Sequence, residues 1–402
     1  MPLDNNMPRW MQLNTSEPAP VLFLDIRGVN ADLNDPATTS RINARLKEML
    51  GAAAPNVIEA PALIKTHIGE PKAWQRINPD LTISSIEFLR GSGIDKIVVG
   101  DSTVLYSRSR GGKENPPDNV GPYMELACAN GWLNLGVPFV VLDRPISSVP
   151  GVCEFSSESV GISTSPPNRF KTIYVCGAVP VMGAIINHVH LTGHGLVGLA
   201  LAMKGISMGF GDRKGKSQMH MVLCPIFDNA ACDRCGICAT ECPENALEYP
   251  NDDPPKLIEE KCIGCSQCLS ECPSGAIEMK PRGVTQWLQG QNTILSRMAD
   301  FFIGIMNGRW DRTVHVAHLV KITVGCDCLN WEQRRMSPDI GFLVGKNPFA
   351  VDKAAELLLE ETSPNDPDVR KLLDQSRRGD VYGYVEKTHG ISTRPEIRPV
   401  AW

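Results

Sequence analysis

The organisation of this chain is decided by the stretch Cys232-Asp-Arg-Cys235-Gly-Ile-Cys238-Ala-Thr-Glu-Cys242-Pro243 and by its repeat, Cys262-Ile-Gly-Cys265-Ser-Gln-Cys268-Leu-Ser-Glu-Cys272-Pro273. The two units are offset by 30 residues and hold eight of the chain's 14 cysteines. Each unit has three cysteines separated by two residues, and then a fourth cysteine followed by proline. Such short, regular steps are typical of ligands to a metal centre.

The spacing predicts two 4Fe–4S clusters. Three closely spaced thiolates wrap one loop around three iron corners, and the fourth, followed by proline, leaves that loop to ligate the other cluster. We therefore assign cluster 1 to Cys232, Cys235, Cys238 and Cys272, and cluster 2 to Cys262, Cys265, Cys268 and Cys242. A zinc ribbon usually has two C-x2-C pairs without the third cysteine and the Cys-Pro step. Over about residues 230–279 the motifs resemble those of two-cluster bacterial ferredoxins.

Length and composition are those of an ordinary globular protein with several domains or one large domain with an insert. The chain has 402 residues, of which 42% are hydrophobic and 21% charged, and its net charge of −5 favours neither nucleic acid nor an anionic membrane as a partner. Residues 226–282 hold eleven acidic and five basic residues, a balance of −6. This acidic segment suits docking of a basic redox protein that donates electrons, although a solvated surface explains the same charge.

No targeting or membrane segment is expected. The first 20 residues lack a basic region followed by an apolar run, so no secretory signal is visible. The uncharged stretch 181–203 contains three histidines and four glycines, which favours a buried helix over a membrane span. We expect a cytoplasmic protein whose thiols stay reduced and available to metals. The sequence leaves the oligomeric state open, a homodimer included.

Strand and helix patterns alternate on both sides of the cysteine repeat. Strands are expected at 21–26, within 57–68, and at 97–99, 139–142, 172–175, 315–324 and 339–344; helices are expected at 41–50, 83–89, 123–129, 284–306 and 351–359. This alternation predicts an α/β fold with a mainly parallel sheet flanked by helices. Because the pattern resumes after the repeat, we expect an α+β ferredoxin-like domain, residues 226–282, inserted between the two parts of an α/β domain, residues 1–225 and 283–402.

Polar residues follow three of the expected strands. They are Lys65-Thr66-His67, Gly100-Asp101-Ser102 and Cys326-Asp327-Cys328. Ligands of open α/β sheets bind at the carboxyl ends of strands, so these residues are candidates for a site, although a carboxylate there is often only a turn former or helix cap. The Cys326 and Cys328 pair can present both sulfurs to one metal, form a redox pair, or serve only the structure.

Histidines form a second candidate group. On a helix, His190 and His194 would be four residues apart on one face, which suits metal binding or proton donation. The glutamate of the H-E-x-x-H motif is missing, so a metalloprotease is not expected. Lys204 and His220 extend the group. Buried histidines bonded to backbone carbonyls explain the same residues without a function.

A glycine- and lysine-rich run follows this group. Arg213 and Lys216 lie in a stretch whose backbone amides and cations suit an anionic group of a substrate. A nucleotide-binding P-loop is excluded, because Phe210 occupies the position of its first glycine and the run does not follow a strand.

Taken together, these residues resemble the family called domain of unknown function 362, whose members are often labelled iron–sulfur-centre proteins. The matching pieces are Lys65 with Gly69, Gly100-Asp101-Ser102, the run from Thr192-Gly193 to Lys216 and His220, Cys326-Asp327-Cys328, Pro338-Asp339-Ile340-Gly341 and Asn347 to Asp352. The chain departs from the family at Lys204-Gly205-Ile206-Ser207, where lysine-asparagine-leucine-glycine is typical. It also has Val189 and His190 where a lysine is usual. The resemblance implies no agreed reaction.

We expect an oxygen-sensitive iron–sulfur oxidoreductase. Electrons from two clusters would reach a small-molecule substrate, or a further metal centre, in a pocket lined by Lys65, His67, Asp101, His190, His194, Lys204 and His220. A protonated histidine or lysine would neutralise the negative charge that the substrate gains. Cys326 and Cys328 would bind a third metal or act as a redox pair. Two alternatives remain, a non-enzymatic electron-transfer subunit and a metallocofactor assembly factor.

Overall fold

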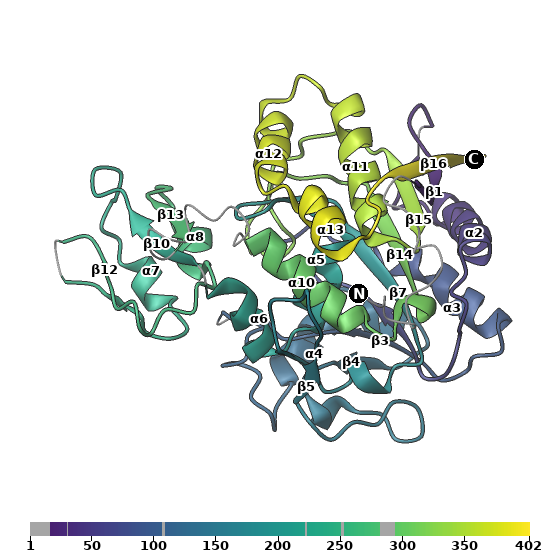
Figure 1. Cartoon of the computed structure of the whole chain (residues 1–402), viewed down its shortest axis with the longest axis horizontal. Coiled ribbons are helices and arrows are strands. Elements are labelled where there is room, and N and C mark those ends of the chain that lie inside the picture. Colours follow the sequence, from purple (N-terminus) through teal and green to yellow (C-terminus); the bar gives the residue numbers. More distant parts are fainter. Residues whose placement is uncertain (1–16, 30, 107–108, 222, 251–252, 282–293) are drawn as a thin grey trace.

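The computed structural model describes residues 17–29, 31–106, 109–221, 223–250, 253–281 and 294–402. Its main body contains an eight-stranded sheet in the order β16-β1-β15-β14-β7-β2-β3-β4 (Figure 1). The strands are β1 (Ala19–Asp25), β2 (Ala62–Lys65), β3 (Ile97–Asp101), β4 (Phe139–Val141), β7 (Ala184–His190), β14 (Thr313–Leu319), β15 (Gly341–Gly345) and β16 (Pro395–Val400). Only β15 pairs antiparallel with its neighbours in this sheet. The predicted α/β fold with a mainly parallel sheet is confirmed.

Helices cover both faces of the sheet. Helices α2 (Pro36–Ala52), α3 (Ile83–Gly91) and α4 (Gly121–Ala129) pack on one face, and α5 (Ala202–Phe210), α10 (Ile294–Met306) and α11 (Pro348–Thr362) pack on the other. Successive residues of β2 enter opposite cores, Leu63 with α5 and α10 and Ile64 with α2 and α3. Both side chains are fully buried, which explains why the central strands read as continuous apolar runs.

The chain reverses direction across the sheet between β2 and β7. From β2 it steps outward through α3 to β3 and through α4 to β4, and then returns to place β7 on the other side of β2. This is a topological switch point, where open α/β sheets bind ligands beyond the carboxyl ends of the strands. The carboxyl ends of β3, β2, β7 and β14 therefore form one edge, which we call the carboxyl edge.

One sequence prediction was wrong about local structure, and a second strand lies outside the main sheet. The stretch 181–203 is not a buried helix but contains β7, β8 (Thr192–His194) and β9 (Gly198–Ala200), because Ile185, Ile186 and Val189 favour a central strand that is buried on both faces. The strand predicted at 172–175 is β6 (Thr172–Cys176), but it pairs antiparallel with β5 (Ser159–Ser163), outside the main sheet. In the part of the chain that the structure describes, no helix is long and apolar enough to cross a bilayer.

The predicted helix 284–306 is observed as α10, and its first ten residues lie outside the described part of the chain. The predicted strand 315–324 ends earlier, as β14 at Leu319. The sequence left the stretch after residue 365 unassigned. It forms α12 (Pro367–Arg378), α13 (Val381–His389) and β16, which pairs parallel with β1.

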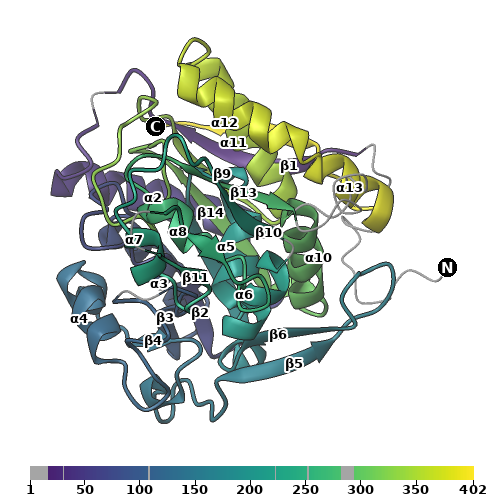
Figure 2. The same ribbon diagram turned by 90° about the vertical axis from the view of Figure 1, so that its left-hand side faces the viewer.

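The cysteine-rich segment projects from the main body (Figure 1). Its ends are joined by the antiparallel pair β10 (Leu223–Phe227) and β13 (Ile277–Pro281). Between them lie α7 (Ile237–Thr240), α8 (Gln267–Glu271) and the pair β11 (Leu247–Glu248) and β12 (Lys256–Leu257). Figure 2 views the molecule from the side on which this segment projects. The expected domain boundary at 225 falls within β10, and the one at 282 lies outside the described residues.

Candidate functional site

The carboxyl edge gathers several of the predicted site residues. Lys65 is the last residue of β2, Asp101 of β3 and His190 of β7. In the sheet, β2 lies between β7 and β3. The turn that holds Cys326 and Cys328 follows β14, which pairs with β7. Parallel strands thus carry side chains that are far apart in sequence to one place.

Asp101 lies at the centre of a buried charge network. Its carboxylate is 3.2 Å from Lys65 Nζ and 2.9 Å from Arg110 Nη2, and all three side chains are at most 3% exposed. Burial alone would raise the pKa of Asp101, but the two cations hold it well below its usual range. Arg110 Nη1 also lies 2.9 Å from His67 Nε2. Burial and Arg110 lower the pKa of His67 to about 3, so this imidazole is neutral and accepts the hydrogen bond.

A glycine makes room for this network. A Cβ at Gly209, near the end of α5, would lie 2.2 Å from Lys65 Cε, so no larger residue fits while Lys65 keeps its place. This close approach gives a physical reason for glycine at position 209.

Cys326 and Cys328 face His194. The two Sγ atoms and one ring nitrogen of His194 all lie within 4.8 Å of one another. The backbone N–H of Cys328 donates to Cys326 Sγ at 3.3 Å, and Lys204 Nζ lies 3.5 Å from the same sulfur. A hydrogen bond from the side chain of Cys328 lowers the pKa of Cys326 to about 6 against the effect of burial, and the charge of Lys204 and the Cys328 N–H add to the shift.

His190 and His194 do not share a helix face, which corrects the sequence prediction. His190 lies at the end of β7 and His194 at the end of β8, and only Leu191 separates the two strands. His190 Nδ1 is 2.8 Å from Asp327 Oδ2, and its Nε2 is 2.6 Å from the carbonyl of Val320. Both ring nitrogens thus face acceptors, and although burial opposes a charge, Asp327 and this carbonyl raise the pKa of His190. His190 holds the turn between the two cysteines, and His194 faces their sulfurs.

The strand β8 is held against the chain before Cys326. Gly193 N–H donates to the carbonyl of Thr323 at 2.8 Å, and a Cβ at Gly193 would lie 2.1 Å from the carbonyl oxygen of Val324. Only glycine permits this approach, which places His194 beside Cys326.

Arg213, Lys216 and His220 lie on helix α6 (Arg213–His220). Arg213 Nη1 donates to the carbonyls of Val104 and Leu105 at 3.2 and 2.9 Å. Lys216 Nζ donates to Ser102 Oγ at 2.9 Å and to the carbonyl of Gly211. These cations therefore brace the loop after β3, and their use as an anion site stays a prediction.

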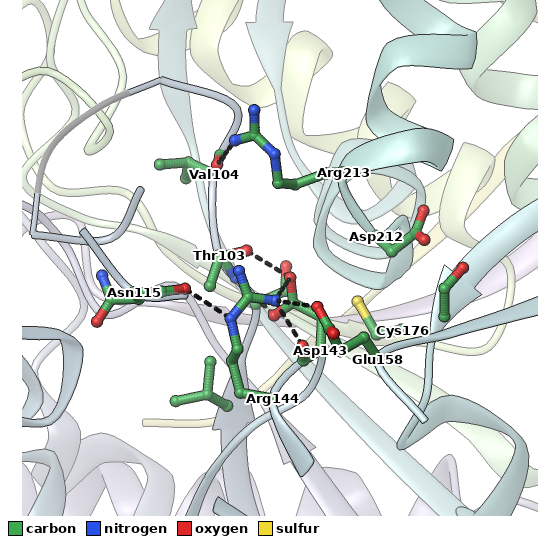
Figure 3. Close-up of polar contacts among 12 residues, drawn as sticks. Thr103, Val104, Asn115, Asp143, Arg144, Glu158, Cys176, Asp212 and Arg213 are labelled. Carbon is green, nitrogen blue, oxygen red and sulfur yellow. Dashed lines mark hydrogen bonds and ion pairs between the residues drawn. The ribbon is translucent and has the colours of Figure 1, made fainter. Parts of the chain in front are cut away.

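The end of β4 holds the same loop from below (Figure 3). Asp143 accepts from the backbone N–H of Thr103 at 2.9 Å and from its hydroxyl. Arg144 Nη1 lies 3.3 Å from the Asp143 carboxylate and 3.4 Å from that of Glu158, and Arg144 Nε donates to the carbonyl of Asn115 at 2.7 Å. Sequence reasoning missed Arg110, Asp143 and Arg144, because no spacing or motif marks them and only the topology brings them together.

The cysteine-rich segment contains two cavities, each lined by four cysteines. The first is lined by Cys242, Cys262, Cys265 and Cys268, and the second by Cys232, Cys235, Cys238 and Cys272. Each draws three cysteines from one unit and the fourth from the other. Four soft sulfur donors around an otherwise largely apolar cavity fit a cubane iron–sulfur cluster.

The first cavity lies against the main body, and we call it the proximal cavity. The carbonyl of Gly264 lies 3.1 Å from His220 Nδ1, and Glu244 pairs with Arg213 at 3.2 Å. Leu269 of α8 packs over Gly195, the residue after His194. The second cavity, which includes the exposed Cys235, is the distal cavity. His220 thus contacts the cysteine-rich segment beside the proximal cavity, and it is not part of the network of Lys65 and Asp101.

Comparison with known proteins agrees with the pattern of these residues. None of the curated proteins matches the chain. Residues 62–356, well over half of the chain, match the family model described as domain of unknown function (DUF362). The matched region includes the strands of the carboxyl edge, the turn at Cys326 and the cysteine-rich segment between them. The chain therefore belongs to the DUF362 family.

Proposed function

We propose that this protein is an iron–sulfur oxidoreductase that delivers low-potential electrons to a small-molecule substrate at the carboxyl edge. The observation that supports this most is the position of the proximal cavity, four cysteines packed beside α6 and the residue next to His194. When bound in these cavities, 4Fe–4S clusters supply one-electron transfer. We also propose residues 226–282 as the electron-transfer domain, inserted between 1–225 and 283–402, in a cytoplasmic and oxygen-sensitive protein.

The distal cavity is the proposed entry point for electrons. Cys235 is exposed there, and the surrounding segment is strongly acidic. A basic electron-donor protein would be attracted to such a surface and aligned on it by its charge. The proximal cavity lies between this entry point and the main body.

The residues of the carboxyl edge suit reduction of an anionic or polarised small molecule. Lys65 and Arg110 hold buried positive charge next to Asp101, and Lys204 is partly exposed beside Cys326. Fixed positive charges at low dielectric stabilise the negative charge that a substrate gains with electrons. Lys204 is the residue placed to donate a proton, because its ammonium group lies 3.5 Å from Cys326 Sγ and the residue is only half-buried.

The cluster assignment can be tested by crosswise substitutions on anaerobically purified protein. Wild type should hold about eight irons and eight sulfides per chain. Cys272→Ala lies in the second unit but lines the distal cavity, and Cys242→Ala lies in the first unit but lines the proximal cavity. Each should remove about four irons, and paramagnetic resonance after reduction should show a single uncoupled cluster. Iron near one or two per chain, or zinc in its place, would overturn the proposal.

The enzymatic role needs a second experiment. Dithionite-reduced protein is mixed with fractions of a small-molecule extract, and cluster reoxidation is followed optically. Reoxidation by a fraction that fails with Asp101→Asn, although this variant keeps its iron, would support a reductase. Reoxidation only by partner proteins would favour the electron-transfer subunit, and transfer of iron and sulfide to an apo-protein would favour the assembly factor.

A further inference from the structure

A site for a single metal ion is built from two elements of the carboxyl edge. The turn after β14 supplies Cys326 and Cys328, and β8 supplies His194, with their ligand atoms within 4.8 Å of one another. We propose that these three residues bind one divalent transition-metal ion of borderline softness, such as zinc or iron(II), and leave a fourth coordination position open. The proposal goes beyond the proposed electron transfer, because it does not depend on the cysteine-rich segment.

The distances favour one ion over a third cluster. Tetrahedral coordination with metal–sulfur bonds of about 2.3 Å places two thiolate sulfurs about 3.8 Å apart. Sulfurs bound to different irons of a cubane lie much farther apart. The ligand atoms of the three residues lie within 4.8 Å of one another, which is close to the sulfur–sulfur distance around a single ion. A side-chain shift of about 1 Å would bring them to the tetrahedral distance.

The surroundings favour a metal over a disulfide. The Cys328 N–H donates to Cys326 Sγ at 3.3 Å, and Lys204 Nζ lies 3.5 Å from that sulfur. Both groups stabilise a negatively charged thiolate, which is the form that binds metals. A disulfide would gain nothing from the imidazole of His194, whereas two thiolates and one imidazole are a common set for catalytic zinc with one open position.

The turn is held in place by residues that are not ligands. Asp327 lies between the two cysteines, but it bonds His190 at 2.8 Å. Gly193 bonds Thr323 at 2.8 Å and so fixes β8 against this turn. Asp327 and His190 are therefore positioning residues, which orient the ligands in the way that outer hydrogen bonds do in known metal sites.

The open position is reachable from solvent. Cys326 is buried, but Cys328 and His194 are partly exposed, and so is Lys204. A ligand that enters here meets the metal and the ammonium group of Lys204 together. The site therefore suits an anionic oxygen or sulfur ligand, which the ion would polarise as a Lewis acid.

Cobalt(II) is a suitable probe because oxidised 4Fe–4S clusters are silent in paramagnetic resonance and high-spin cobalt is not. The full chain, purified anaerobically with its clusters, is treated with a chelator and then titrated with cobalt(II). We expect one tightly bound cobalt per wild-type chain. Cys328→Ser and His194→Gln should each weaken binding at least tenfold, and the nitrogen coupling seen by electron–nuclear double resonance should disappear only in His194→Gln.

Controls separate this proposal from folding and from the clusters. Cys128→Ala removes an exposed thiol outside the site and should bind cobalt like wild type. Iron content and the signal of the reduced clusters should be equal in all variants, and their loss would indicate a damaged segment and not a missing ion. Equal cobalt binding by wild type and Cys328→Ser would overturn the proposal. So would wild type whose Cys326 and Cys328 resist alkylation until a disulfide is reduced.

Discussion

The two sulfur-rich regions of this molecule are built in opposite ways. In the cysteine-rich segment, all eight cysteines that line the cavities come from residues 232–272, and their spacing decides which four meet. At the carboxyl edge, His194 and Cys326 are 132 residues apart and meet only because β7 and β14 are neighbours. In the cysteine-rich segment the spacing along the chain positions the cysteines, whereas at the carboxyl edge the order of the strands in the sheet positions the residues.

This difference has an energetic side. The segment has a small apolar core, which includes Cys238 and Cys268 themselves, so bound clusters would replace much of the usual packing. The carboxyl edge rests on large cores on both faces of the sheet. A substitution in the cysteine-rich segment should therefore affect the stability of that segment alone. A substitution at the carboxyl edge should lower the stability of the whole main body.

The largest effect is expected from Cys265→Ala. Loss of one ligand to the proximal site should lower the iron content from about eight to about four per chain. Because the ligands of the segment are local, the main body should unfold at nearly the same temperature as in wild type. Iron analysis and circular dichroism measure both quantities. Cooperative loss of the main body in this variant would break the comparison.

Asp101→Asn should have the opposite pattern. It leaves the buried Lys65 and Arg110 without their shared carboxylate, which typically costs about 3–5 kcal/mol of unfolding free energy. The iron content should stay at the wild-type value. Denaturant unfolding measures the loss, and Asp233→Asn, at an exposed position of the segment, is the control that should change stability little. A loss below 1 kcal/mol would show that the network is solvated.

Gly209→Ala tests whether packing fixes Lys65. The added Cβ would lie 2.2 Å from Lys65 Cε, and displacing that side chain should cost about 1–3 kcal/mol. Gly51→Ala is the matched control, because that position lies in α2 with nothing within 4 Å of the added atom. Alanine there should stabilise the protein by up to about 1 kcal/mol. The same sign of change in both variants would contradict the proposed close packing.

The smallest effect concerns pH. His188 and His315 lie on β7 and β14 below the site, and burial lowers the pKa of each to about 3. Below about pH 6.5 the unfolded chain binds more protons at these positions than the folded chain, so the free energy of unfolding falls as the pH drops from about 6.5 towards 3. At pH 5.5 each histidine should cost about 1.4 kcal/mol. His188→Asn should make this slope shallower, and an unchanged slope would refute its neutral, buried state.

Sequence reasoning succeeded where the information is local. The alternation of strands and helices predicted the α/β sheet, and the polar residues expected at strand ends do lie at the ends of β2 and β3 and after β14. It failed where partners come from elsewhere in the chain. No sequence motif marks Arg110 as a partner of Asp101. The pairing of Arg144 with Glu158 arises because the residues after β4 lie close to those before β5. His190 and His194 have helical spacing, but the neighbouring strands of the sheet decided their conformation.

The position of β1 has a consequence for biosynthesis. Its two partners in the sheet are β15 and β16, which begin more than 300 residues later. At ribosomal speeds of about 5–20 residues per second, β1 waits on the order of tens of seconds before either partner has been made. The cysteines of residues 232–272 leave the ribosome during that interval. If the proposed clusters are inserted into the nascent segment, their insertion can thus precede closure of the sheet.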